Sequence, residues 1–236
     1  MKRTTIILLG LLFSAHLLNA QTDFRPGYII KTLGDTAFGQ IDYRGDLLMS
    51  SVCSFEGSDN ILNEYSPNDI TAFRFTDSKY FVSREIDQKK VFLEYLIRGR
   101  VNIYYLRNES GDHYYLDKEG VELTEIPYEE GITEVDGKQM YFETKTHIGI
   151  LFYIMQDAPV IQKRIETIKK PEHHNLIKLA EEYHNTVCPD EKCIIYTKSI
   201  PFIKIIPEVT FGLINYSNVE DLDDKYYIET GIIGHL

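Results

Sequence analysis

Two cysteines and a histidine have the clearest spacing for chemistry in this sequence. Cys188 and Cys193 flank Pro-Asp-Glu-Lys just after a predicted helix, and His184 lies one helical turn before Cys188. A turn containing Pro189 can bring the two thiols together, and cysteines of an exported chain are oxidised by default. We therefore predict a Cys188–Cys193 disulfide. The alternative is a metal site formed by His184 and the two thiolates, although a second cysteine pair is missing.

The other candidates for chemistry fit known sites poorly. His173 and His174 are neighbours, so their side chains diverge on a helix, and we expect them to mark a solvated helix start. The acidic loop 220–224 lacks the glycine and the distal glutamate of an EF-hand calcium loop. The stretch 131–139 is too long for a P-loop, and Gln139 stands where Ser or Thr would bind Mg²⁺. We therefore predict a chain that is not an enzyme, with no catalytic residue, no cofactor and no metal site.

The first residues have the pattern of an export signal. Lys2 and Arg3 precede an apolar run over 6–18, and a small residue, Ala20, follows it. This run is too short for a comfortable membrane-spanning helix and matches the apolar region of a secretory signal peptide. We predict a signal peptide over 1–20 with cleavage between Ala20 and Gln21, so the chain is expected in the periplasm or at the outer membrane.

The charge balance excludes one class of partner. The chain has a formal net charge of −11, and removal of the signal peptide takes away two positive charges. An acidic protein without a run of Lys and Arg is a poor partner for phosphate backbones, so we predict no binding to nucleic acid. Beyond the signal, no apolar stretch approaches the ~18 residues of a helical membrane span. Any entry into a membrane would therefore use strands.

Residues 21–143 have the composition of strands and turns. Gly34-Asp35 and Asp136-Gly137 are hairpin signals, and many short β-rich segments lie between them. Strands this close together leave no room for crossover helices, so the sheet must be antiparallel, as a sandwich or an open barrel. Segments 91–93 and 103–106 are apolar on both faces and need cover on both sides. Cys53 is expected to be a buried thiol in one of these strands.

The segment 144–199 is expected to supply a helical cover. An apolar run over 148–155 has helical length, and Pro171 can begin a further helix. Four residues of that second helix share one face, which predicts a buried stripe: Leu176, Ala180, Tyr183 and Val187. We predict an α+β, mainly β fold in which this helical segment packs on the antiparallel sheet.

The last part of the chain is again strand-like. In 200–216 apolar and polar residues alternate, and 226–236 is a second apolar run behind an acidic loop. We expect a strand hairpin over 200–236, long enough for the first strands of a β-barrel. A barrel needs about eight strands. Two strands would leave it incomplete.

Together these segments resemble an uncharacterised family of exported envelope proteins. Members have a β-rich N-terminal module, a helical segment and then an outer-membrane β-barrel. The residues that carry the resemblance are 27–30 (GYII), 34–36 (GDT), 39–43 (GQIDY), 66–70 (SPNDI), 157–159 (DAP) and 205–216. The resemblance implies a fold and a location, and it implies no activity.

Two functions follow as hypotheses. The first is a non-enzymatic structural or interaction protein of the bacterial cell envelope, a periplasmic module associated with the outer membrane. Its expected partners are that membrane or another envelope protein. The alternative is a soluble periplasmic binding module whose last strands complete its own sheet. The sequence does not identify a small-molecule ligand for either.

Overall fold

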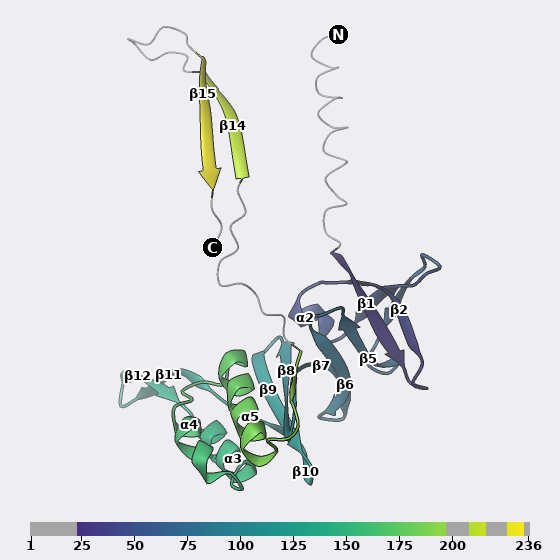
Figure 1. The fold of residues 1–236 in the computed structure, drawn as a ribbon. Coiled ribbons are helices and arrows are strands. Elements are labelled where there is room, and N and C mark those ends of the chain that lie inside the picture. Colours follow the sequence, from purple (N-terminus) through teal and green to yellow (C-terminus); the bar gives the residue numbers. More distant parts are fainter. Residues whose placement is uncertain (1–22, 197–207, 216–225, 234–236) are drawn as a thin grey trace. The chain divides into compact units, whose positions relative to one another are not determined.

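The computed structural model describes residues 23–196, 208–215 and 226–233 (Figure 1). The chain divides into two compact units, Met1–Lys198 and Ser199–Leu236. Within the described residues, no helix has both the length and the apolar character needed to cross a membrane. The predicted signal peptide, with its cleavage site at Ala20 and Gln21, lies outside these residues.

One antiparallel sheet of eleven strands forms the framework of the first unit. Its strands are β1 (Phe24–Lys31), β2 (Thr36–Asp42), β3 (Cys53–Glu56), β4 (Leu62–Tyr65), β5 (Ile70–Phe75), β6 (Tyr80–Ile86), β7 (Lys89–Arg98), β8 (Val101–Asn108), β9 (Gly111–Lys118), β10 (Val121–Glu125) and β13 (Ile194–Ile195). Their order is β10-β9-β8-β7-β6-β5-β1-β2-β3-β4, and β13 pairs with the end of β7. The predicted mainly β, antiparallel fold is confirmed, and the sheet is not closed into a barrel.

Short helices cover one face of the sheet at β7, β8 and β9 (Figure 1). They are α3 (Thr146–Ile154), η2 (Pro159–Ile161), α4 (Gln162–Glu166) and α5 (His173–Val187). Three residues of the predicted stripe on α5 are fully buried, namely Leu176, Ala180 and Tyr183, whereas Val187 at the helix end is half-buried. The apolar residues of β7–β9 that needed cover therefore receive it from these helices on this face.

The same face has a second core between β1 and β7. Four phenylalanines meet there: Phe73, Phe75, Phe81 and Phe92. Residues of β2 and β3, including the buried thiol of Cys53, join the cluster, which requires this half of the sheet to curve. Glycine permits the close approach: a Cβ on Gly39 would lie 2.2 Å from the Glu56 carbonyl oxygen and 2.7 Å from the Phe55 ring.

Three charged side chains, here called the Lys79 cluster, link the β5–β6 turn to α2 (Asp46–Met49) and β7. Lys79 donates to Asp46 of α2 at 2.6 Å and to Glu94 of β7 at 2.8 Å. Burial raises the pKa of Glu94, and the Lys79 ammonium offsets part of this rise. Burial also lowers the pKa of Lys79, but the two carboxylates outweigh it and the pKa lies above its ordinary value. The cluster is therefore a buried ion pair together with a third side chain that is more exposed.

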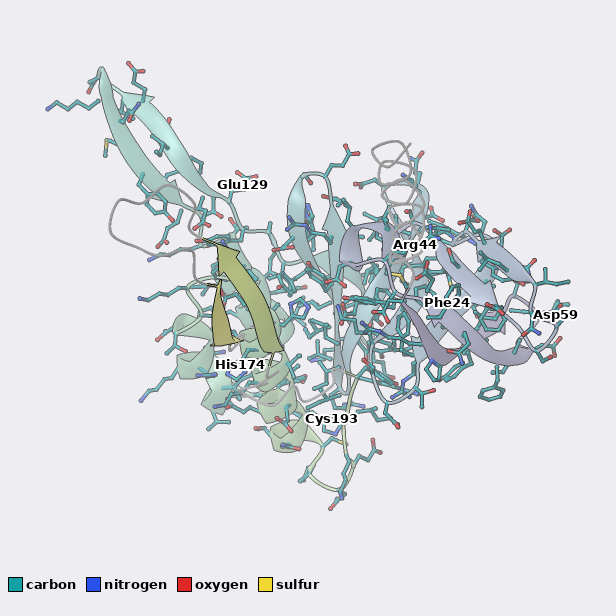
Figure 2. All side chains as sticks on the ribbon, turned by 90° about the horizontal axis from the view of Figure 1, so that it is seen from above. Phe24, Arg44, Asp59, Glu129, His174 and Cys193 are labelled. Carbon is teal, nitrogen blue, oxygen red and sulfur yellow. The ribbon has the colours of Figure 1, made fainter. Side chains whose placement is uncertain are left out.

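Two hairpins form two-stranded sheets of their own. β11 (Glu130–Val135) and β12 (Lys138–Glu143) pair with each other through the predicted Asp136-Gly137 turn, where both residues have positive φ. Figure 2 labels Glu129 at the base of this hairpin, which projects away from the sheet. In the second unit, β14 (Glu208–Asn215) and β15 (Tyr226–Ile233) pair antiparallel with each other. This pairing confirms the predicted terminal hairpin over its described residues.

Candidate functional site

The predicted disulfide is not present in the structure. Cys188 ends α5, Cys193 lies in the loop that follows (Figure 2), and both carry free thiols. A hydrogen-bonded histidine holds this loop instead. His184 accepts the Arg100 backbone N–H at Nδ1, 3.0 Å away, and its Nε2 lies 3.0 Å from the Glu191 carbonyl oxygen, to which it donates.

His184 therefore has a structural role. Both ring nitrogens are used for backbone groups, so neither is free to bind a metal ion. The side chain is almost fully buried and joins the end of α5 to the turn between β7 and β8. No group of three or more His, Cys, Asp or Glu side chains in the described part of the chain is arranged to hold a metal ion.

The expectation of a solvated helix start is wrong for His173. His174 is exposed, but the ring of His173 lies 4.4 Å from that of Tyr105, and its Nδ1 is 2.9 Å from the Tyr114 hydroxyl. Burial lowers the pKa of His173. The first turn of α5 packs against β8 and β9, and a single-residue pattern cannot show which of two neighbouring histidines faces the sheet.

One contact has the residue types of a hydrolase triad. Ser110 Oγ lies 2.8 Å from His113 Nε2, and His113 Nδ1 lies 2.8 Å from Glu125 Oε1. However, Asn108 Oδ1 accepts both the Ser110 backbone N–H and, at 2.6 Å, its hydroxyl proton. Asn108 Oδ1 therefore competes with His113 Nε2 for the single Ser110 hydroxyl proton, whereas in a triad the histidine is the acceptor of that proton. The contact fastens the β8–β9 turn to β10.

The face of the sheet opposite the helices contains the candidate binding site. Six residues lie directly across from one another on β1, β5, β6, β7, β8 and β9 and form a continuous row, here called the tyrosine ladder: Tyr28, Arg74, Tyr80, Tyr95, Tyr104 and Tyr115. The rings of Tyr80 and Tyr95 stack at 6.0 Å and those of Tyr95 and Tyr104 at 4.6 Å. Such directly opposed aromatic pairs stabilise neighbouring strands.

A cleft of about 620 Å³ opens over the first five residues of this ladder. Besides those five it is lined by Ile30, Thr71, Ala72, Val82, Arg84, Arg98, Asn102, Asp117 and Tyr196. We call it the arginine–tyrosine cleft. Its volume lies within the ~300–1,000 Å³ range of small-molecule sites. The cleft is thus large enough to hold a ligand of two to three rings.

The arginines of the cleft differ from the others that the structure describes. Five described arginines form ion pairs with carboxylates: Arg25, Arg44, Arg100, Arg107 and Arg164. The three described arginines without such a pair all line this cleft: Arg74, Arg84 and Arg98. Arg74 lies over the Tyr196 ring at 5.0 Å, and its buried Nε has no hydrogen-bond partner among the described residues. The described arginines without an ion pair are therefore grouped at this one cleft.

A hydrogen-bonded edge borders the arginines. Tyr95 donates to Asn102 Oδ1 at 2.7 Å, and Asn102 Nδ2 donates to Asp117 at 2.5 Å. Tyr104 donates to the other oxygen of Asp117 at 3.0 Å. Burial, with a contribution from Asp117, raises the pKa of Tyr104 to about 12. Tyr104 therefore stays neutral at physiological pH.

No protein-family model, curated protein or solved structure matches this chain. The cleft has to be interpreted from its own side chains.

Sequence reasoning missed the arginine–tyrosine cleft. The ladder brings together residues from six strands, and only the register between strands places them opposite one another. One local signal was present: in the alternating strand pattern, Arg74 and Arg84 each lie on the same face of the strand as tyrosines or small apolar residues. An arginine on a half-buried strand face needs a partner, and neither arginine has a carboxylate residue nearby in the sequence on the same face of its strand.

Proposed function

We propose that this chain is a non-enzymatic binding module exported to the cell envelope, and that it holds an anionic ligand in the arginine–tyrosine cleft. The observation that carries the proposal is the segregation of its arginines. Those that the structure describes outside the cleft are neutralised by carboxylates, whereas Arg74, Arg84 and Arg98 are not. Arginine presents planar, forked donors that suit carboxylate and phosphate groups.

The partly buried position of these cations supports binding rather than solubility. Arg74 and Arg84 are half-buried, and Arg84 lies over the Tyr104 ring at 5.6 Å. Guanidinium groups held against aromatic rings lose little further side-chain entropy when they bind an anion. Hydrogen bonds to charged groups contribute about 1.5–3 kcal/mol each, so two preorganised arginines are enough for specific binding.

The first test is binding of simple anions to the purified chain from Gln21 onward. We expect a panel of citrate, glucuronate and galactose 1-phosphate to include at least one ligand that binds at 1:1 stoichiometry in isothermal titration calorimetry. Arg74→Met should weaken that binding about tenfold or more, since one charge-assisted hydrogen bond is worth at least about 1.4 kcal/mol. Arg107→Met, which removes a surface arginine paired with Asp112, is the matched control and should leave binding unchanged.

Failure of every anion to bind, or equal loss in the Arg74→Met and Arg107→Met variants, would contradict the proposal. The melting temperature of each variant should be measured alongside, because a folded Arg74→Met protein is needed to interpret its lost binding.

Export and membrane association form a separate prediction. The proposal expects the protein in the envelope fraction, with a mature N-terminus at Gln21. If residues 200–236 associate with the outer membrane, the protein stays in the membrane pellet after alkaline carbonate extraction. Complete release by carbonate would favour the soluble periplasmic module, and a cytoplasmic protein that retains Met1 would contradict export.

A further inference from the structure

Resting on the proposed function, a more specific ligand class follows from the shape and polarity of the arginine–tyrosine cleft. The tyrosine ladder crosses the sheet perpendicular to its strands, and neighbouring strands are about 4.8 Å apart. The cleft includes ladder residues from five adjacent strands, from Tyr28 on β1 to Tyr104 on β8. The rings of Tyr95 and Tyr104 are buried, and Tyr196 packs over Tyr80 and Tyr95. The cleft therefore offers an elongated row of polar groups and not open ring faces, which suits a ligand whose polar groups are spread along its length.

The polar groups of the cleft select a ligand rich in hydroxyls. The hydroxyl groups of Tyr28, Tyr80 and Tyr196 have no partner among the described residues, so each can both donate and accept. Asp117 receives one hydrogen bond on each oxygen and has lone pairs to spare, and Asn102 keeps one amide proton free. Sugar hydroxyls donate and accept at the same atom and can satisfy all of these groups. An aliphatic acid would leave them unpaired.

The charge of the cleft selects a carboxylate over a phosphate. Three arginines provide the attraction, but Asp117 lies on the same face and lines the same cleft. A phosphate monoester carries close to two negative charges at neutral pH, so Asp117 opposes it more strongly than it opposes a carboxylate with one charge. Carboxylates spread along successive rings can also reach Arg74 and Arg84 separately, because these arginines belong to different strands.

We infer that the arginine–tyrosine cleft binds an acidic oligosaccharide along its length, with carboxylates on Arg74 and Arg84, and sugar hydroxyls on the tyrosine hydroxyls and the Asn102–Asp117 edge. The binding is non-covalent and requires no co-reactant. The ligand is identified by its chemistry, as a chain of uronic-acid-type sugars.

Calorimetry with four probes tests this inference. The probes are digalacturonate, its dimethyl ester, galactose 1-phosphate and adipate. The ester keeps both rings and removes both charges, and adipate keeps two carboxylates and removes the rings. We expect digalacturonate to bind at least tenfold more tightly than each of the other three. Tighter binding of galactose 1-phosphate or adipate would overturn the oligosaccharide assignment while leaving anion binding intact. Absence of binding by all four would overturn both proposals.

Two variants separate the roles of charge and hydroxyl recognition. Arg74→Met should weaken digalacturonate and adipate to a similar degree. Asn102→Ala should weaken digalacturonate several-fold and leave adipate unchanged. Because Asn102 also bonds Tyr95 and the backbone of Gly99, that variant could unfold. Tyr28→Leu, at the half-buried end of the ladder, then provides the same comparison. Equal effects of either variant on both ligands would contradict hydroxyl recognition.

Discussion

Replacing Lys79 by Met should lower the free energy of unfolding by about 3 kcal/mol, because it leaves Glu94 buried without its counter-charge. Glu94 is 2% exposed, and Lys79 Nζ lies 2.8 Å from its carboxylate. Breaking a buried pair by removing one partner costs about 3–5 kcal/mol, and the partial exposure of Lys79 favours the lower end. Urea unfolding of the purified chain, followed by tyrosine fluorescence, measures the loss.

The double variant Lys79→Met, Glu94→Leu is the control for this prediction. Replacing a whole buried ion pair by apolar side chains is often neutral, so the double variant should recover most of the stability. If the double variant instead lost stability equal to the sum of two equal single-variant losses, the pair would act through packing alone.

The loss in Lys79→Met should also depend on pH. Burial raises the pKa of Glu94 in the folded protein, so the folded state binds a proton more strongly than the unfolded chain does. Stability arising from that proton is fully present below the unfolded pKa of about 4.3 and is lost as pH rises through the folded pKa. Without Lys79 that folded pKa rises further. The destabilisation should therefore be larger at pH 8 than at pH 5, and the reverse order would contradict a charged Glu94.

Local patterns predicted those parts of the fold that depend on local chemistry. The Gly34-Asp35 and Asp136-Gly137 turns form because glycine, and aspartate more readily than most residues, can adopt the positive φ that tight turns require. The stripe on α5 forms because its spacing matches the helical period. The antiparallel sheet was predicted because only a few residues separate consecutive strands along the chain. Each of these inferences needed only a few consecutive residues.

The candidate site depended on contacts that no short segment contains. Arg74 acquires its neighbours Tyr28 and Tyr80 only through the register of β1, β5 and β6. The same limit explains the disulfide prediction. The spacing of Cys188 and Cys193 suggested a disulfide, whereas the residue that holds the loop is His184. The second hydrogen bond of His184 is to the backbone of Arg100, more than eighty residues earlier. Long-range pairing decides such roles.

The largest stability loss is expected for Phe73→Ala, at about 4 kcal/mol. Phe73 is fully buried and contacts three other phenylalanines, with ring centroids 4.7 Å from Phe81, 4.9 Å from Phe92 and 6.2 Å from Phe75. Truncation of a buried phenylalanine costs about 3–5 kcal/mol because it removes apolar contacts and leaves a cavity. The described helices α3–α5 pack at the other end of the sheet, so this half relies on its aromatic cluster.

The matched control is Phe38→Ala on β2, whose side chain is 73% exposed and which should lose less than about 1 kcal/mol. Phe73 also precedes Arg74 on β5, with the two side chains on opposite faces of the sheet. The phenylalanine cluster therefore supports the strand that presents Arg74 to the cleft. A saturating anionic ligand should raise the melting temperature of Phe73→Ala as it does that of the unaltered protein, because ligand binding stabilises the folded state by mass action. A Phe73→Ala protein that is as stable as Phe38→Ala would contradict the aromatic cluster as the core of this half of the sheet.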